Sequence, residues 1–161
     1  MLSPPSGSGW DIKSIDRKIN IFIGDEKHIT FKAKPLWMYL LTQDFLVAFY
    51  PFIYVPNEAL PCQDAISRET IMHHKMQHIR QQRRHGKWKW LLLYLTNKAF
   101  RLHNEAEAIA AELAGTDNIK RNAILKLYAK QLSSHQYFWC AKSVAHAKTR
   151  ILDAFARKTY L

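Results

Sequence analysis

Two histidines, His74 and His78, are four residues apart in the stretch HHKMQHIRQQ. On an α-helix with about 3.6 residues per turn, position i+4 lies almost above position i, so both imidazoles point the same way. A carboxylate from a second helix would complete a set of two imidazoles and one acid, which is typical of zinc sites with a fourth position open to water. The spacing therefore predicts a metal site, with Zn²⁺ as the expected cofactor.

Two acids of the later stretch NEAEA, Glu105 and Glu107, are candidates for the third ligand. On a helical wheel for residues 98–114, Glu105 lies within the apolar stripe and Glu107 lies outside it. Because burial of an unpaired carboxylate is costly, Glu105 should have a cationic partner. The wheel predicts Glu105 as the ligand, with Glu107 as the alternative. A buried ion pair of Glu105 with Arg80 or Arg101 is the competing interpretation.

The helix that contains the histidines has two different faces. One face is apolar, with Met72, Met76 and Ile79. The opposite face contains both histidines and Gln81, and Gln81 or Gln82 is expected to orient a metal ligand by a hydrogen bond. His73 points about 100° away from its neighbour His74 and is expected to be a surface histidine.

The pattern H-x-x-x-H-I-x-Q-Q, followed 27 residues after the second histidine (105 − 78) by E-x-E-A, resembles the small gluzincin-type zinc metallopeptidases. In their HExxH-x-x-Q…E-x-E-A motif, both histidines and the later glutamate bind zinc. The resemblance covers about residues 52–114 and implies a zincin-like fold, hydrolysis of peptides or amides, and His74, His78 and Glu105 as the zinc ligands. Small open reading frames of this layout occur in bacterial and bacteriophage genomes.

The chain departs from this motif at Lys75, which occupies the position of the catalytic glutamate. A protonated lysine cannot accept a proton, so the general base does not carry over. The family pattern also expects an acid four residues after the ligand glutamate, and Ile109 stands there. Glu58 and Asp64, before the histidine helix, are candidate substitutes. We expect a metal-binding protein whose hydrolytic activity is lost or altered.

Spacing and turn signals place the elements around these residues. Residues 20–31 alternate around Gly24-Asp25 and predict a hairpin, and residues 35–50 have helical spacing. Residues 52–55 are β-favouring and stand between two prolines, which predicts a short strand. Helices are expected from Asp64 or Ser67 to about Arg84 and then over 87–95, 97–114, 117–132 and 134–158.

This order predicts an α+β, mostly helical, zincin-like single domain with a small β-element before the active-site helix. Residues 1–10 are expected to form a flexible arm, and residues 11–161 the domain. Within it, the metal-binding part spans about 52–114 and the C-terminal helices about 116–158. The apolar segments 35–56 and 88–95 are too interrupted or too short to span a membrane and are expected to lie in the core.

The 161 residues include 24 Lys and Arg against 13 Asp and Glu, which gives a net charge of +11. Such a charge favours polyanionic partners, and basic residues interleave with Trp88 and Trp90. A basic module that binds nucleic acid, a cell-wall polymer or another anionic surface is therefore the alternative function. A structural component of a virion or other assembly is a third.

The two cysteines, Cys62 and Cys140, have no CxxC partner, so neither a disulfide framework nor a cysteine zinc site is expected. The first residues lack the pattern of a signal peptide. The expected location is the cytoplasm of the host cell or the virion. A protein or peptide is the expected substrate if catalysis survives.

Overall fold

The structure is a computed structural model, and it describes residues 29–36, 38, 46–55 and 65–159. The chain divides into two compact units, Met1–Asp64 and Ala65–Leu161. A small sheet lies in the first unit, and the second unit is helical. The predicted α+β, mostly helical class is therefore confirmed, whereas the zincin-like single domain remains a prediction.

The sheet of the first unit has three strands, β1 (Thr30–Ala33), β2 (Val47–Phe49) and β3 (Phe52–Val55). The predicted strand β3 lies in the middle, parallel to β1 and antiparallel to β2. The helix predicted for 35–50 is wrong at Val47–Phe49, because this segment pairs with β3 after the short Tyr50-Pro51 turn. Of the predicted hairpin 20–31, residues 20–28 lie outside the described part of the chain.

The helical unit contains five α-helices and one short 3-10 helix. Their bounds are α3 (Ala65–His85), α4 (Lys87–Thr96), α5 (Lys98–Ala114), α6 (Asn118–Leu132), η1 (His135–Tyr137) and α7 (Val144–Thr159). The four helices from α3 to α6 agree with their predicted ranges to within one or two residues. The last predicted helix is wrong at its start, because α7 begins ten residues later than expected (144 − 134). The chain turns there through Phe138 and Trp139, whose φ angles of 52° and 46° are left-handed and cannot continue a helix.

Local signals separate the first four helices of this unit, α3 to α6. Gly86 has a φ of 80°, a conformation that side chains rarely adopt, and it ends α3 before α4 begins. The side-chain oxygen of Asn97 accepts a hydrogen bond from the backbone N–H of Phe100 at 3.0 Å and caps α5. Asp117 caps α6 in the same way, with Lys120 N at 2.9 Å. These short junctions determine where the side chains of α5 lie relative to α3.

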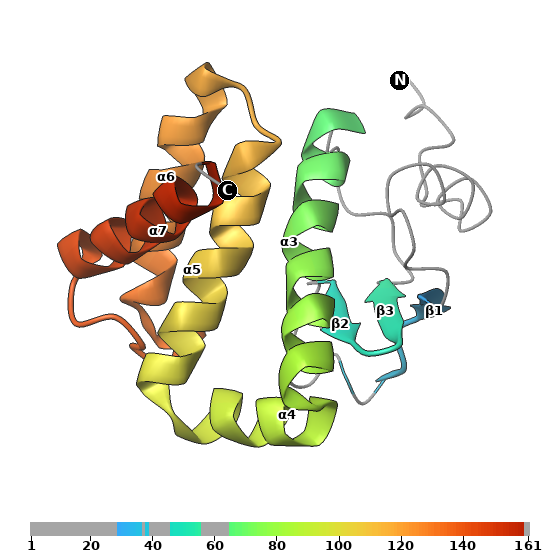
Figure 1. Ribbon diagram of the computed structural model, residues 1–161. Coiled ribbons are helices and arrows are strands. Elements are labelled where there is room, and N and C mark those ends of the chain that lie inside the picture. Colours follow the sequence, from blue (N-terminus) through green and yellow to red (C-terminus); the bar gives the residue numbers. More distant parts are fainter. Residues whose placement is uncertain (1–28, 37, 39–45, 56–64, 160–161) are drawn as a thin grey trace, which may run out of the picture. The chain divides into compact units, whose positions relative to one another are not determined.

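Helix α5 lies at the centre of the helical unit, with α3 on one side and α6 and α7 on the other (Figure 1). Its face toward α6 and α7 is apolar and contributes Ile109 and Leu113 to the core. The facing helices contribute Leu132 and Ile151, which are fully buried. Full burial of such a side chain contributes about 1.5–3 kcal/mol. The other face of α5 is polar, and it packs on α3.

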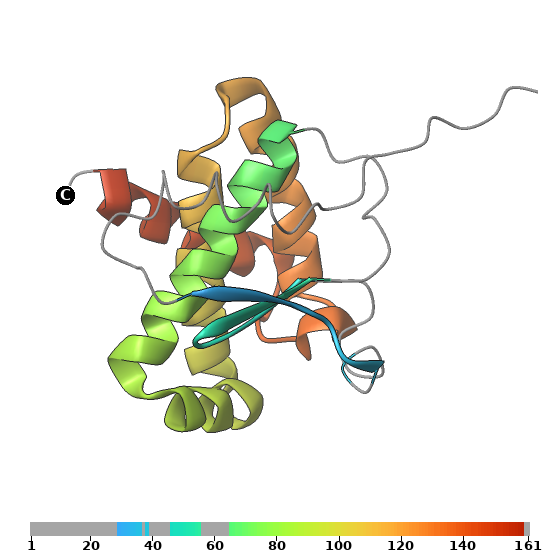
Figure 2. The same cartoon turned by 90° about the vertical axis from the view of Figure 1, so that its right-hand side faces the viewer.

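Helix α4 lies at one end of the helical unit, between the end of α3 and the start of α5, as the view turned by 90° also shows (Figure 2). The prediction that 88–95 lies in the core is correct for Trp90, which is buried. It is wrong for Trp88, Leu92 and Leu95, which are exposed, because a ten-residue helix at an edge has one covered face only. Among the described residues, no helix has the combination of length and apolar character that crossing a bilayer requires.

We expect Asn97→Ala to lower the free energy of unfolding by about 1 kcal/mol, because the first turn of α5 loses its side-chain cap. Urea unfolding followed by circular dichroism measures this change. Asn97→Ser keeps an acceptor at the same place and should lose less than half as much. Equal losses in the two variants would show that the cap is not what holds this junction.

Candidate metal centre

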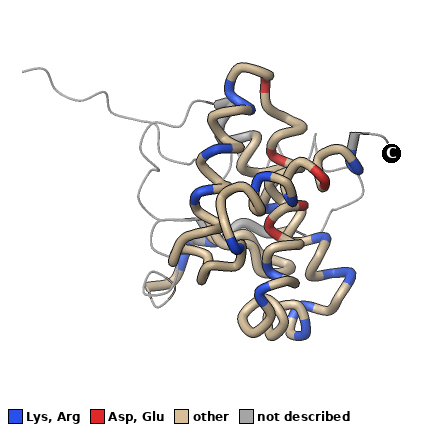
Figure 3. The backbone as a smooth tube through the Cα atoms, turned by 90° about the vertical axis from the view of Figure 1, so that its left-hand side faces the viewer, with Lys and Arg blue, Asp and Glu red and all other residues tan. Residues whose placement is uncertain are grey.

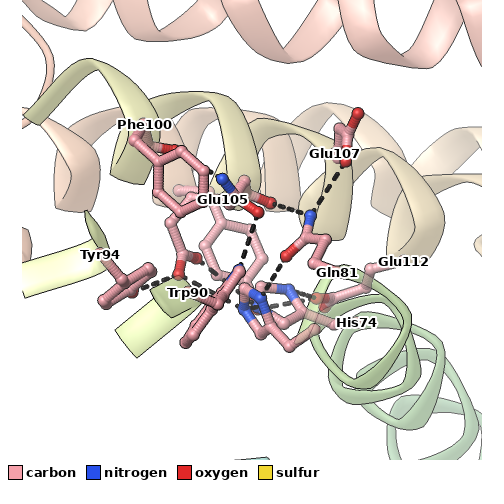
Figure 4. A network of polar contacts seen from close by, with 11 residues as sticks. His74, Gln81, Trp90, Tyr94, Phe100, Glu105, Glu107 and Glu112 are labelled. Atoms are coloured by element: carbon pink, nitrogen blue, oxygen red, sulfur yellow. Dashed lines mark hydrogen bonds and ion pairs between the residues drawn. The ribbon is translucent and has the colours of Figure 1, made fainter. Parts of the chain in front are cut away.

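Two histidines of α3 and one glutamate of α5 come together between these helices (Figure 4). His74, His78 and Glu105 are buried, with exposed fractions of 3%, 6% and 2%. The Nε2 atoms of the two histidines are 3.2 Å apart. His78 Nε2 lies 3.3 Å from Glu105 Oε1, and His74 Nε2 lies 3.6 Å from Glu105 Oε2. This buried group could hold a metal ion.

The tautomer of His78 follows from the orientation of Gln81. The side-chain nitrogen of Gln81 lies 2.9 Å from the backbone oxygen of Asn104 and 3.0 Å from Glu107 Oε2, and both of these atoms only accept hydrogen bonds. The other end of the amide is therefore its oxygen, and this oxygen lies 2.9 Å from His78 Nδ1. Since an amide oxygen cannot donate, His78 Nδ1 must carry the proton. In neutral His78, a lone pair of Nε2 then points toward Glu105.

Glu112 orients His74 in a similar way. His74 Nδ1 lies 3.1 Å from Glu112 Oε2, which also accepts a hydrogen bond from the Tyr128 hydroxyl at 2.8 Å. A carboxylate only accepts, so His74 Nδ1 donates and the Nε2 lone pair of the neutral ring points inward. The Tyr128 ring stacks on the His74 ring, with centroids 5.7 Å apart.

The donor set fits a cation. Two lone pairs 3.2 Å apart repel one another unless a proton or a metal ion lies between them. Glu105 Oε2 is fully buried and has no hydrogen-bond partner. Burial of an unsatisfied carboxylate oxygen is costly, and a cation at the point where the three groups converge would satisfy it.

The protonation of the three groups is strongly coupled. Burial raises the pKa of Glu105, but the two imidazoles beside the carboxylate prevail and hold it well below its usual range. Burial and Lys75 oppose the protonation of His74, yet the nearby carboxylates of Glu105 and Glu112 raise its pKa. Burial lowers the pKa of His78. Glu105 is therefore ionised at neutral pH, and His74 is the more easily protonated of the two imidazoles.

Two aromatic residues of α4 close one side of the site. The hydroxyl of Tyr94 donates a hydrogen bond to Glu105 Oε1. The Trp90 ring stacks on Tyr94, with centroids 4.6 Å apart, and lies edge-on to His78 at 5.7 Å. Trp90 Nε1 donates to the side-chain oxygen of Asn104 at 2.9 Å. These contacts leave Glu105 in a largely apolar environment apart from its partners.

The alternative residues lie elsewhere. Glu107 is partly buried, and its oxygens contact Gln81, Gln77 at 3.4 Å and His103 at 3.3 Å rather than the histidine pair.

Arg101 donates to the backbone oxygens of Tyr94 and Leu95 at 2.8 and 3.3 Å, so the competing ion pair with Glu105 is wrong for this arginine. Arg80, the other candidate, is exposed.

The remaining predicted residues differ in how deeply they are buried, and two of them lie outside the described residues. Gln82 is fully buried, and His73, the expected surface histidine, is partly buried beside Gly115. Lys75 is partly buried, and burial lowers its pKa although Glu105 and Glu112 act in the opposite direction. The suggested substitute bases, Glu58 and Asp64, lie outside the described part of the chain.

Sequence reasoning missed three partners of the ligands, which are Tyr94, Glu112 and Tyr128. Glu112 had a usable signal, because it follows Glu105 by seven residues and two helical turns bring it to the same face. The tyrosines had none, since tyrosines are common on helices that pack against a core. No family model, curated protein or solved structure matches the chain, so its function must be inferred from these side chains.

In protein treated with a chelator, the interaction of Glu105 with the two histidines should make the free energy of unfolding depend on pH. Because the pKa of Glu105 is depressed, its contribution to stability is present above its ordinary value of 4.5 and is lost as pH falls through the folded-state pKa. The difference in unfolding free energy between wild type and Glu105→Gln should therefore narrow below about pH 4.5. Urea unfolding at pH 6.0, 5.0 and 4.0 measures it; a constant difference would contradict the coupling.

Proposed function

We propose that this chain is a zinc-binding, metallopeptidase-like protein whose metal ligands are His74, His78 and Glu105. One observation carries the proposal. Two inward-facing imidazole nitrogens lie 3.2 Å apart, and each is held in place by an acceptor on its outer nitrogen. They face a buried carboxylate oxygen that has no hydrogen bond. The resemblance of the motif to gluzincin-type enzymes supports the same three ligands.

The spacing of the two imidazole nitrogens is compatible with zinc. In a tetrahedral site with Zn–N bonds of about 2.0–2.1 Å, two ligand atoms lie about 3.3–3.4 Å apart. The two Nε2 atoms are 3.2 Å apart, close to this value, and each lies near a different oxygen of Glu105, at 3.3 Å from Oε1 for His78 and at 3.6 Å from Oε2 for His74. Two imidazoles and one carboxylate are also a ligand set found in catalytic zinc sites. Glu112 and Gln81 supply the hydrogen bonds that zinc-binding histidines usually make through their second nitrogen.

The position of Lys75 argues against efficient hydrolysis. Bound zinc would polarise a substrate carbonyl and lower the pKa of a water molecule. In the gluzincin-type motif the residue after the first histidine is the glutamate that takes up the proton. A lysine ammonium has no lone pair for this purpose, and loss of a general base typically costs about 10²–10⁴-fold in rate. We therefore propose that the metal site is retained and that peptide or amide hydrolysis is weak or lost.

Metal analysis of the purified protein tests the ligand set. Inductively coupled plasma mass spectrometry measures the zinc content. We expect about one zinc ion per wild-type chain and none in His74→Ala or Glu105→Gln, because each substitution removes one of three ligands. Glu107→Gln is the matched control, since it makes the same change two residues away and should keep its zinc. Circular dichroism establishes that each variant is folded.

Glu112→Gln refines this experiment, because it alters the carboxylate that accepts from His74 Nδ1 and Tyr128 but removes none of the three ligands. Replacement of such an outer partner usually weakens metal binding by about 10–100-fold without abolishing it. Competition with a zinc-binding dye measures the affinity. If wild type has no stoichiometric zinc after exposure to the ion, or if His74→Ala and Glu107→Gln bind it alike, the ligand set is wrong.

The Lys75→Glu variant tests the lost base. We expect it to hydrolyse casein or peptidoglycan peptides faster than wild type, by up to about 10²–10⁴-fold, because it restores a proton acceptor beside the metal. Lys75→Gln is the control: it also removes the positive charge but adds no base, and it should stay as inactive as wild type. Turnover by wild type equal to that of Lys75→Glu would contradict the proposed loss of catalysis.

A further inference from the structure

Helix α4 has an apolar stripe on its outer side. Trp88, Leu92 and Leu95 are spaced by four and three residues, so they lie on one face of the helix. Their exposed fractions are 67%, 63% and 57%. Large apolar side chains grouped in this way on a surface usually mark a site that binds a partner or a membrane.

Positive charge surrounds this stripe. No Asp or Glu occurs between Glu69 and Glu105, the part of the chain that contains most of α3 and all of α4. The exposed basic residues of this part are Arg80, Arg83, Arg84, Lys89 and Lys98. The tube view shows Lys and Arg without Asp or Glu at the end of the unit where α4 lies (Figure 3). The surface at this end therefore attracts anions.

Two further exposed aromatic residues follow η1, and the first of them lies near the end of α4. Phe138 and Trp139 are 59% and 60% exposed, and both have left-handed backbone conformations that are uncommon for aromatic residues. The guanidinium of Arg101 lies 5.2 Å from the Phe138 ring centroid and donates hydrogen bonds to Tyr94 O and Leu95 O. Arg101 thus connects Phe138 to the C-terminal end of α4.

We propose that α4, with Phe138 and Trp139, binds the surface of an anionic lipid bilayer. Trp and Leu side chains would enter the boundary between headgroups and acyl chains, while Lys and Arg contact the lipid phosphates. The ten residues of α4 are too few to cross a bilayer, so the helix would lie in its plane. Phosphates of a nucleic acid would use the same charges, but they offer nothing for Leu92 and Leu95 to contact. Lipid therefore explains the charges and the leucines together.

Co-sedimentation of the full chain with lipid vesicles tests the proposal. We expect binding to vesicles that contain phosphatidylglycerol and much weaker binding to vesicles of phosphatidylcholine alone. The double variant Leu92→Ser/Leu95→Ser should reduce binding at least about tenfold, because two inserted leucines are lost. Arg84→Glu/Lys89→Glu should reduce it in a manner that depends on the salt concentration.

Two matched controls use α6, which also has exposed aliphatic and basic residues. Ile119→Ser/Leu127→Ser makes the same polar change at two exposed aliphatic residues, and Lys126→Glu/Lys130→Glu makes the same charge change. Both should bind vesicles like wild type. Circular dichroism and zinc content establish that the α4 variants are folded around an unchanged metal site.

Three outcomes would overturn the proposal. The first is no binding to phosphatidylglycerol vesicles at low salt. The second is binding that the Leu92→Ser/Leu95→Ser variant retains in full, which would reduce the contact to charge alone. The third is a dimer in analytical ultracentrifugation that this variant dissociates while vesicles are not bound, which would assign the stripe to a second copy of the chain. None of these outcomes bears on the ligand set of the metal site.

Discussion

The convergence of His74, His78 and Glu105 between α3 and α5 is the constraint on which the centre of the helical unit depends. All three side chains are buried, and the Nδ1 atom of each imidazole has an acceptor, on Glu112 for His74 and on Gln81 for His78. In a medium of low dielectric constant, such a network is stable only when all its groups are satisfied. Glu105 Oε2 is the atom that is not. A cation bound at this point of the folded chain would therefore also stabilise the packing of α3 on α5.

Much of the helical fold could be predicted because its boundaries depend on short-range signals. Gly86, Asn97 and Asp117 act within one turn of their own position, so the sequence around each one shows where a helix ends or begins. The failures came from longer-range effects. Val47 has the spacing of a helix but pairs with a strand that follows a turn, and that pairing is decided by backbone hydrogen bonds between separate segments. The left-handed Phe138 interrupts a stretch whose composition suits a helix.

The candidate metal site likewise has a part that could be predicted from the sequence and a part that could not. The two histidines of one helix could be recognised together because four residues separate them, and Glu105 was distinguished from Glu107 because a buried acid in an apolar stripe needs a partner. The residues that orient the ligands were harder to find. Glu112 shares a face with Glu105, but Tyr128 reaches Glu112 from α6, and nothing in the spacing of α6 indicates which helix it will face. Partners of this kind become visible only once the packing of three helices is known.

Helix α4 lies between the candidate metal centre and the surface of the helical unit, and its two faces make different contacts. Trp90 and Tyr94 point inward, where Tyr94 donates to Glu105 and Trp90 packs edge-on to His78. Leu92 and its exposed neighbours point outward. Substitutions on the outer face leave the inner hydrogen bonds and ring contacts in place, whereas a substitution of Trp90 or Tyr94 would disturb the carboxylate and the imidazole directly. Because one short helix separates the two sets of contacts, the proposed metal binding and the proposed lipid binding should be separable by substitution.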